Sequence, residues 1–394
     1  MRKMTVSDID VKGKSILVRA DFNVPLDEKS SITDDTRIRA TLPTINYLLQ
    51  AGAKKIILMS HLGRPDGKVN PKYSLRPVAY RLKQLLKEPV LFLPDCVGEK
   101  IKSEIAKAKE RVILLENLRF HPEEEANDPK FAQQLAELAD IYVNDAFGTA
   151  HRAHASTEGV SHYLKAVCGF LLEKEIEYLG NAIANPKRPF VVILGGAKVS
   201  DKIGVIDNLL PLCDTILIGG GMAYTFLKAQ GKQIGNSKLE KDKLEVATSI
   251  LNKAKALKKE IVLPIDNVVV DKIDPTASTE IVGEDIPEGK IAVDIGYKTI
   301  ELFQSKLMYA KTVVWNGPLG IFEMEPFSSG TRKVMDFISK LPGATTILGG
   351  GDTAAAAAKF KLEDKITHIS TGGGASLEFL EGKILPGIAC LLDR

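Results

Sequence analysis

The sequence predicts an α/β protein of two domains, each a doubly wound, Rossmann-like parallel sheet with helices on both faces. Three observations predict this class. Short apolar runs alternate with segments of helical periodicity along nearly the whole chain, which is typical of parallel strands joined by crossover helices. The chain has 394 residues, which is long for one hydrophobic core and suits two. The residues that end the apolar runs also change midway, from polar and cationic side chains to glycines.

The first half contains five apolar runs that we interpret as strands, at 15–25, 54–65, 89–95, 111–122 and 140–156. A helix is predicted over 36–50, where Ile38, Leu42, Ile45 and Leu49 recur at helical spacing. Further helices are predicted over 75–86 and 128–138. The latter opens with an Asp-Pro pair suited to a cap and first turn.

All of these runs except the third end in polar, often cationic side chains. Ligands of open parallel sheets bind outside the carboxyl ends of the strands, so we expect these side chains on one rim. Each alone could be an ordinary surface ion pair. Their recurrence at successive strand ends favours a site for a strongly anionic small molecule, which guanidinium groups can grip. The rim residues are Arg19, Asp21, Asn23, His61, Arg64, Arg119, His121, Asn144, Asp145, His151 and Arg152.

His151 and His154 form an H-x-x-H pair that could be mistaken for metal ligands. No cysteine or carboxylate lies near them at a known metal spacing, so we do not expect a metal there.

Residues 168–183 form one predicted amphipathic helix, in which Leu172, Ile176, Leu179 and Ile183 recur at helical spacing. An Asn-Pro pair ends it. The helix lies where the character of the strand ends changes, so we interpret it as the connection between the domains. A core helix of either domain would show the same pattern.

The second half repeats the alternation, but its strands end in glycines, at 194–202, 217–226, 314–323, 348–358 and 370–379. Glycine lets a ligand approach the backbone closely, and several such turns on one rim can bind a base and phosphates. One such turn could reflect tight packing alone, whereas their recurrence indicates a nucleotide site. Residues 263–299 are interpreted as strands and loops at the far edge of this domain.

The stretch 190–204 carries Lys198 and Lys202 four residues apart, just after a double glycine. If the segment after Gly196 is helical, both ammonium groups lie beside unpaired amides, and that combination attracts phosphate. The stretch matches neither a Walker A loop nor a G-x-G-x-x-G turn. Asp352, which follows three glycines, could be a simple helix cap. We favour a magnesium ligand, because a phosphate site without a cation would leave charge uncompensated.

Composition narrows the function classes. A net charge of +3 is small for this length and argues against a general nucleic-acid binder. The four cysteines form no C-x-x-C pair, so neither a zinc knuckle nor a disulfide framework is expected, and reduced thiols in a cytosol fit best. No apolar run approaches membrane-spanning length, and the N-terminus lacks the apolar core of a signal peptide. We expect a soluble cytoplasmic protein.

Nine segments together resemble the signature segments of the phosphoglycerate kinase family, in that family's order and over nearly the whole chain. They are DFNVP, SHLGRP, LLENLRFH, VNDAFGTAHRAHAS, GGAKVSDK, GGGMA, VWNGPLGIFE, GGGDT and STGGGASLEF. The resemblance implies reversible phosphoryl transfer between 1,3-bisphosphoglycerate and MgADP, giving 3-phosphoglycerate and MgATP. We expect a monomer without a nucleic-acid or membrane partner, although the sequence does not fix the oligomeric state. It implies an N-terminal domain over 1–167, joined by 382–394, an interdomain helix over 168–184, and a nucleotide domain over 185–381, with the domains facing each other across a cleft.

The resemblance also implies site residues. The triose-phosphate site would comprise Asp21, Asn23, Arg37, His61, Arg64, Arg119 and Arg152. The nucleotide site would comprise Gly195, Lys198, Lys202, Gly219, Gly220, Gly296, Asn316, Glu323, Gly350, Gly351, Asp352 and Thr353. Within it, Glu323 would bind the ribose and Asp352 the magnesium.

The chemistry itself needs little from the protein beyond positioning. A carboxylate acceptor with a pKa of about 4 is already ionised at pH 7, so no general base is required. Alignment and neutralisation of the transferring group remain, and we assign them to Arg37, Lys198, Mg²⁺ and the amides around Gly373 and Gly374. Facing domains would have to close about the 168–184 helix.

Two other classes share parts of the pattern. A dinucleotide-dependent oxidoreductase would need G-x-G-x-x-G with an acidic residue about twenty positions on, and we do not find it. A non-catalytic nucleotide-binding regulator would not need both the cationic set and Asp352.

Overall fold

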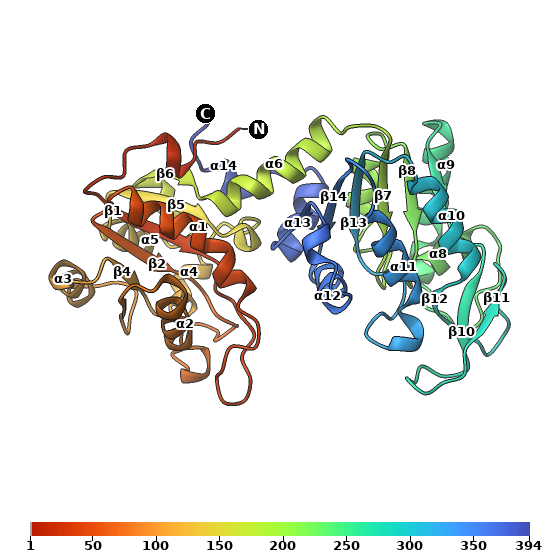
Figure 1. The fold of residues 1–394 in the computed structure, drawn as a ribbon, viewed down its shortest axis with the longest axis horizontal. Coiled ribbons are helices and arrows are strands. Elements are labelled where there is room, and N and C mark those ends of the chain that lie inside the picture. The colour runs from red at the N-terminus through yellow and green to blue at the C-terminus, as the bar shows by residue number, and fades with distance from the viewer. Residues whose placement is uncertain (1) are drawn as a thin grey trace. The chain divides into compact units, whose positions relative to one another are not determined.

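The computed structural model of the chain describes residues 2–394 (Figure 1). It separates into two compact units. The N-terminal unit comprises Met1–Glu177 and Ile384–Arg394, and the C-terminal unit comprises Tyr178–Lys383. Each unit contains a six-stranded parallel sheet, which confirms the predicted fold class.

The sheet of the N-terminal unit has the strand order β3-β4-β2-β1-β5-β6, and every strand pair is parallel. Its central strands are buried on both faces, so they consist of nearly continuous apolar runs rather than alternating ones. The strands are β1 (Ser15–Ala20), β2 (Lys55–Met59), β3 (Val90–Phe92), β4 (Val112–Leu114), β5 (Ile141–Asp145) and β6 (Lys165–Cys168). The helices are α1 (Thr36–Gln50), α2 (Arg76–Leu86), α3 (Glu99–Lys107), α4 (Pro122–Glu125), α5 (Pro129–Ala136) and α14 (Pro386–Ala389).

The C-terminal unit repeats this plan with the strand order β15-β14-β13-β7-β8-β9, again all parallel. Its strands are β7 (Phe190–Leu194), β8 (Thr215–Ile218), β9 (Glu260–Val262), β13 (Thr312–Asn316), β14 (Thr345–Gly349) and β15 (His368–Ile369). A separate antiparallel sheet, β11-β10-β12, contains β10 (Asn267–Val270), β11 (Glu280–Val282) and β12 (Ile291–Ile295). The helices are α7 (Ile203–Leu209), α8 (Ala223–Ala229), α9 (Leu244–Ala256), α10 (Tyr297–Leu307), α11 (Ser329–Ile338), α12 (Gly351–Lys359) and α13 (Gly373–Leu380).

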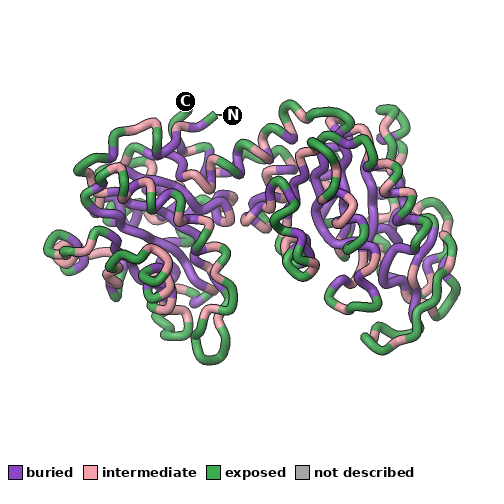
Figure 2. The backbone as a smooth tube through the Cα atoms, in the orientation of Figure 1, coloured by how far each residue is buried: buried purple, intermediate pink, exposed green. Residues whose placement is uncertain are grey.

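The core of each unit lies between its sheet and the covering helices, and Figure 2 shows buried segments through the middle of both units, where the central strands lie. Ile16, Val18, Ile56 and Leu58 belong to one core cluster in the N-terminal unit. A second cluster, in the C-terminal unit, is built around Trp315, which is fully buried.

The helix predicted over 168–183 is α6 (Phe170–Ala184). Cys168 instead ends strand β6, which the sequence pattern did not reveal because only four residues form it. The boundary between the two units falls inside α6, after Glu177.

The last residues of the chain pack within the N-terminal unit. Met4 N donates a hydrogen bond to Leu392 O at 2.8 Å, and Gly387 N donates to Ala150 O at 2.9 Å. Among residues 2–394, no helix combines the length and the hydrophobicity needed to cross a membrane.

Candidate active site

In the N-terminal unit, the loops that follow β1 and β2 are joined by polar contacts at the carboxyl edge of the sheet. Asp21 follows β1, and its Oδ2 accepts a hydrogen bond from Arg37 Nη1 at 2.9 Å. Arg37 belongs to the first turn of α1. The Asn23 side chain accepts a hydrogen bond from Gly63 N at 2.9 Å. These contacts fix Asp21, Asn23 and Arg37 beside the residues that leave β2.

His61 lies among cations. Its side chain is buried, and its Nδ1 is 3.3 Å from Arg19 Nη2. Burial holds the pKa of His61 well below its usual value, and the positive charges of Arg19, Arg119 and Arg37 lower it further. His61 is therefore neutral at pH 7.

Arg119 and Arg152 bring further cations to this edge. Arg119 Nη1 donates to Gly63 O at 2.8 Å. Arg152 Nε lies 3.2 Å from His151 Nε2. Burial and the neighbouring arginines lower the pKa of His154 to about 4, so this ring is also neutral.

Arg64 differs from the other cations of this edge. Its side chain is exposed and forms no hydrogen bond or ion pair with any residue in 2–394. We call Arg37, His61, Arg64, Arg119 and Arg152 the basic cluster. Because its charge is only partly balanced by Asp21 and nearby glutamates, the cluster suits a multiply charged anion.

Arg19 does not face the rim as expected, because its side chain is almost fully buried. Its Nε donates to Ser156 Oγ at 2.8 Å, and that hydroxyl donates to Glu124 Oε1 at 2.5 Å. Glu124 is itself completely buried, and burial raises its pKa. The guanidinium of Arg19 therefore contacts the His61 ring inside the protein and is not presented to solvent.

Three other rim residues have structural partners away from the basic cluster. His121 pairs with Asp95, with Nε2 and Oδ1 2.7 Å apart. Asn144 Nδ2 donates to Gly387 O at 2.8 Å. Asp145 accepts hydrogen bonds from Leu171 N and Leu172 N, at the start of α6. These three side chains lie near the carboxyl ends of the strands, as predicted, but their hydrogen bonds go to structural partners and not to the basic cluster.

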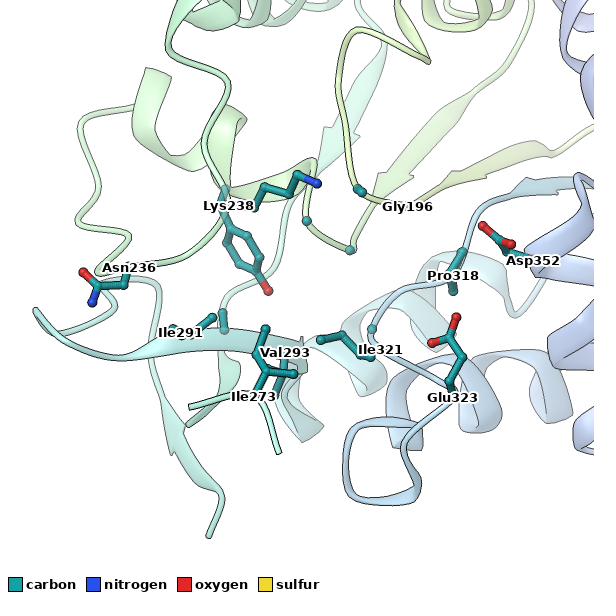
Figure 3. A pocket seen from close by; sticks show the side chains of 16 residues that line it. Gly196, Asn236, Lys238, Ile273, Ile291, Val293, Pro318, Ile321, Glu323 and Asp352 are labelled. Carbon is teal, nitrogen blue, oxygen red and sulfur yellow. The ribbon is translucent and has the colours of Figure 1, made fainter. Parts of the chain in front are cut away.

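The C-terminal unit contains a pocket of about 510 Å³ at the carboxyl ends of β7, β8 and β13 (Figure 3). Its wall is mainly apolar, while Lys238, Glu323 and Asp352 bring charge to it. Figure 3 shows Lys238 extending toward Gly196, with Glu323 and Asp352 on the side of Pro318. Such a wall accepts a planar base, and the charged groups suit a sugar and phosphates. The lining residues are Gly196, Ala197, Gly220, Gly221, Tyr224, Asn236, Lys238, Ile273, Ile291, Ala292, Val293, Pro318, Gly320, Ile321, Glu323 and Asp352.

Most of the predicted glycines serve close packing of the turns rather than the pocket surface. A Cβ on Gly195 would lie 2.1 Å from Pro318 O, and one on Gly219 would lie 2.6 Å from Leu319 Cδ2. Gly220 has φ +66° and does line the pocket. These glycines let the turns after β7, β8 and β13 touch one another.

Gly296 was expected in the nucleotide site but is not among the lining residues. It packs against the Asp266 carboxylate and caps α10. Ala292, four residues earlier on β12, lines the pocket in its place.

The expectation that Lys198 and Lys202 lie on a helix is wrong, because α7 begins only at Ile203. Lys202 is buried, and its Nζ donates to Asn316 Oδ1 at 2.5 Å. Burial lowers the pKa of Lys202, whereas the charges of nearby carboxylates, Asp352 among them, oppose that shift. Lys198 is exposed and has no hydrogen bond or ion pair with the described residues.

Asn316 and the start of α12 complete this region. Asn316 Nδ2 is buried without a hydrogen-bond partner, close to Gly350. Gly350 has φ +90° and caps α12, which Gly351 begins. Thr353 is buried and accepts a hydrogen bond from Gly317 N at 2.7 Å, so it holds the turn after β13. This region favours the binding of phosphate, because it contains the unpaired Asn316 Nδ2, the buried Lys202 and the free first-turn amides of α12.

Gly373 and Gly374 begin α13, with Gly372 at the cap. A Cβ on Gly373 would meet no atom within 4 Å, so open space adjoins its backbone. The first-turn amides of α13 have no partner inside the helix. They can therefore donate to an anionic group.

Sequence reasoning missed part of the pocket wall, namely Asn236, Lys238, Ile273, Ile291, Ala292 and Val293. Several of these come from β12 and from the segments around 236 and 273, which carry no glycine turn. Only their spatial position connects them with the nucleotide site.

Comparison with known proteins gives a consistent result. The family described as "Phosphoglycerate kinase" matches residues 6–383. Curated phosphoglycerate kinases of Dictyoglomus turgidum and Thermosipho africanus are 58% and 56% identical, each over 399 residues, covering 100% of this chain and 100% and 99% of the relatives. Among solved structures, phosphoglycerate kinases from Coxiella burnetii and Pyrococcus horikoshii match with TM-scores of 0.90 and 0.84, at 42% and 34% identity. Each covers 98% of both chains.

Proposed function

The chain belongs to the phosphoglycerate kinase family, and from that premise we propose how its residues perform the family's reaction. The enzyme is an ATP:3-phosphoglycerate 1-phosphotransferase of glycolysis. It transfers a phosphoryl group reversibly from the acyl phosphate of 1,3-bisphosphoglycerate to ADP, which gives 3-phosphoglycerate and ATP. The observation that carries the site assignment is the contrast between the two units, with the basic cluster in one and the glycine-lined pocket in the other.

The basic cluster binds the triose phosphate. Arg64 is exposed and unpaired, and so is available to grip the phosphate or carboxylate of the substrate. Asp21 and Asn23 accept hydrogen bonds from Arg37 and from Gly63 N, and in doing so hold the loops at this edge in place. Neutral His61 can act as a hydrogen-bond donor or acceptor to the substrate without adding charge.

The pocket of the C-terminal unit binds the nucleotide. Its apolar wall takes the base, and exposed Glu323 accepts hydrogen bonds from the ribose hydroxyls. The phosphates extend toward Lys202, Asn316 and the first turn of α12, where free donors are available.

Asp352 fits a magnesium ion. Its carboxylate is exposed at the pocket and forms no hydrogen bond or ion pair within residues 2–394. Mg²⁺ is commonly held by one carboxylate together with nucleotide phosphates. When bound, the ion supplies charge neutralisation and orients the phosphates.

The transfer step needs positioned cations rather than a base. The acceptor carboxylate of 3-phosphoglycerate has a pKa of about 4 and is ionised at pH 7. Arg37, steadied by Asp21 at 2.9 Å, and the free ammonium of Lys198 neutralise the moving group. The first-turn amides at Gly373 and Gly374 donate hydrogen bonds to its oxygens.

We further propose that the two units close about α6 when both substrates are bound, so that the substrates meet with water excluded. We propose that the enzyme acts as a monomer. The four cysteines are unpaired, which suits the reducing cytoplasm.

Arg64→Ala tests the assignment of the basic cluster. Loss of one phosphate-binding guanidinium should raise KM for 3-phosphoglycerate at least tenfold, because a charge-assisted hydrogen bond contributes about 1.5–3 kcal/mol. KM for ATP should change less than twofold, as measured in an assay that follows ATP consumption with 3-phosphoglycerate. Arg76→Ala, a change of another exposed arginine, serves as the control. Equal losses for both substrates would contradict the assignment.

A further inference from the structure

We propose that Asp95, Cys96 and His121 form a binding site for a borderline-soft divalent cation of the zinc class, separate from the magnesium site at the nucleotide. One ligand atom from each residue lies within 4.8 Å of the other two. The residues come from two loops, one after β3 and one after η3 (Leu118–Phe120), which follows β4. Because β3 and β4 are parallel neighbours, their carboxyl ends bring these loops together.

The ligand atoms have the chemistry that Zn²⁺ prefers. A cysteine sulfur, a histidine nitrogen and a carboxylate oxygen are its common protein ligands, and a water can take the fourth tetrahedral position. Hard cations such as Mg²⁺ and Ca²⁺ prefer all-oxygen sites, so the cysteine discriminates against them.

The three side chains are already held near one another. His121 Nε2 and Asp95 Oδ1 are 2.7 Å apart, and the same carboxylate oxygen accepts from Cys96 N at 2.7 Å. The His121 ring packs on Phe131, with their centroids 5.0 Å apart, which restricts its rotation. The packing of His121 on Phe131 and the hydrogen bond from Cys96 N to Asp95 can persist when an ion binds, so little further ordering is needed.

Cys96 is held by a second layer of contacts. Its Sγ donates to Glu116 O at 3.0 Å. The Glu116 carboxylate is fixed in turn by Ser74 Oγ at 2.7 Å and Leu75 N at 2.8 Å. The sulfur is buried, whereas His121 and Asp95 are partly exposed, so a cation would enter from solvent between those two side chains.

Binding requires a defined change in protonation and no redox step. Cys96 loses its thiol proton to solvent and gives up the hydrogen bond to Glu116 O. His121 releases to solvent the Nε2 proton that faces Asp95 and keeps its ring proton on Nδ1, so that Nε2 can bind the cation. The new metal bonds replace the contact between His121 and Asp95. The bound ion would tie the β3 and β4 loops together two residues from Arg119 of the basic cluster.

The test uses the full chain, stripped with a chelator and titrated with Zn²⁺ alone in the absence of nucleotide. Calorimetry should show one equivalent bound to the wild type and to Cys213→Ser, which alters a buried thiol in the other unit. The same binding should be lost in Cys96→Ser and in His121→Gln. Glutamine can still donate a hydrogen bond to Asp95, so His121→Gln keeps the contact between the two loops while removing the metal ligand.

Two further readouts keep the proposal falsifiable if Cys96→Ser folds poorly. Co²⁺ should give a sulfur-to-metal charge-transfer absorption with the wild type and with Asp352→Asn, but not with Cys96→Ser. Zn²⁺ should raise the melting temperature of the wild type but not that of His121→Gln, because a ligand of the folded state stabilises it. Zn²⁺ binding that survives both Cys96→Ser and His121→Gln would overturn the proposal, as would a wild type that takes up no Zn²⁺ at micromolar concentration. Asp95, Cys96 and His121 would then have only a structural role, as a hydrogen-bonded contact between the two loops.

Discussion

At the scale of single residues, the exposed and unpaired side chains are the ones available for chemistry. Lys198 is exposed without a partner, whereas Lys202, four residues on, is buried and bonded to Asn316. The two lysines therefore have different roles despite their similar place in the sequence. We propose that Lys202 helps to form the phosphate-binding region and that the exposed ammonium of Lys198 contacts the transferring group.

Lys198→Ala should lower kcat by about 10²-fold, because one positioned charge is removed from the transition state. The dissociation constant for ADP should change less than threefold, since Lys202 and the α12 amides remain. Turnover and ADP binding by calorimetry measure the two effects. Lys241→Ala, which alters an exposed lysine outside the pocket, should change neither. Unchanged turnover in Lys198→Ala would refute its role.

Glu124→Gln addresses the buried support of the basic cluster. Removing this negative charge leaves the buried Arg19 without the carboxylate to which Ser156 links it, so the free energy of unfolding should fall by about 3 kcal/mol. KM for 3-phosphoglycerate should rise, because a shift of Arg19 would also displace His61, which it contacts. KM for ATP should stay constant. Urea unfolding and substrate kinetics provide the measurements.

Glu123→Gln is the matched control, since Glu123 is exposed on the same short helix. If the two variants behave alike, the Arg19, Ser156 and Glu124 contacts have no positioning role.

At the scale of elements, the start of α6 depends on Asp145. This carboxylate is buried at the end of β5 and accepts hydrogen bonds from Leu171 N at 2.9 Å and Leu172 N at 3.2 Å. Thr44 Oγ1 accepts from Phe170 N at 2.9 Å. Burial nonetheless raises the pKa of Asp145 to about 7. The first turn of α6 is thus capped by a group that titrates near neutrality.

Asp145→Asn should flatten the pH dependence of stability. The pKa of Asp145 rises from 3.8 to about 7 on folding, so the folded state binds more protons within this interval. Stability contributed by this group is present below about pH 4 and is lost as the pH rises to about 7. The free energy of unfolding in urea at pH 5 and pH 8 should therefore differ less in the variant than in the wild type.

Asp10→Asn, at an exposed carboxylate, should leave the pH dependence unchanged. Asp294 behaves like Asp145 in the C-terminal unit, where burial also raises its pKa to about 7, so part of the dependence remains in Asp145→Asn. An unaltered slope in Asp145→Asn would show that this carboxylate is ionised throughout the interval.

At the scale of the whole molecule, the proposed reaction joins two units that each have their own sheet and core. Only α6 and the segment near residues 383–384 connect them in sequence. In the closure proposed above, the energy would come from the bound substrates, because a ligand shifts a conformational equilibrium only by its difference in affinity for the two states.

Small-angle scattering should show a smaller radius of gyration with 3-phosphoglycerate and a magnesium nucleotide together than with either alone. We expect both ligands to be required, because each is proposed to bind to one unit only. Using Lys198→Ala as the second sample separates closure from turnover. A radius that stays constant under all ligand conditions would argue against closure.

The fold class and most strand positions follow from local patterns in the sequence. Helix α1 occupies the predicted range, Thr36–Gln50, because its apolar spacing is a local property of the chain. The glycines that end the strands of the C-terminal unit could be identified from the sequence for the same reason, because a tight turn requires glycine at the turn itself.

Which side chains are buried, paired or exposed depends on the tertiary structure. It buries Arg19, pairs His121 with Asp95, moves the start of α7 beyond Lys202, and places Lys238 and Ala292 in the pocket wall. Each of these outcomes depends on contacts between residues far apart in the chain. Desolvation and neighbouring charge, which set the pKa values of His61 and Asp145, arise from the same long-range packing and leave no local pattern in the sequence.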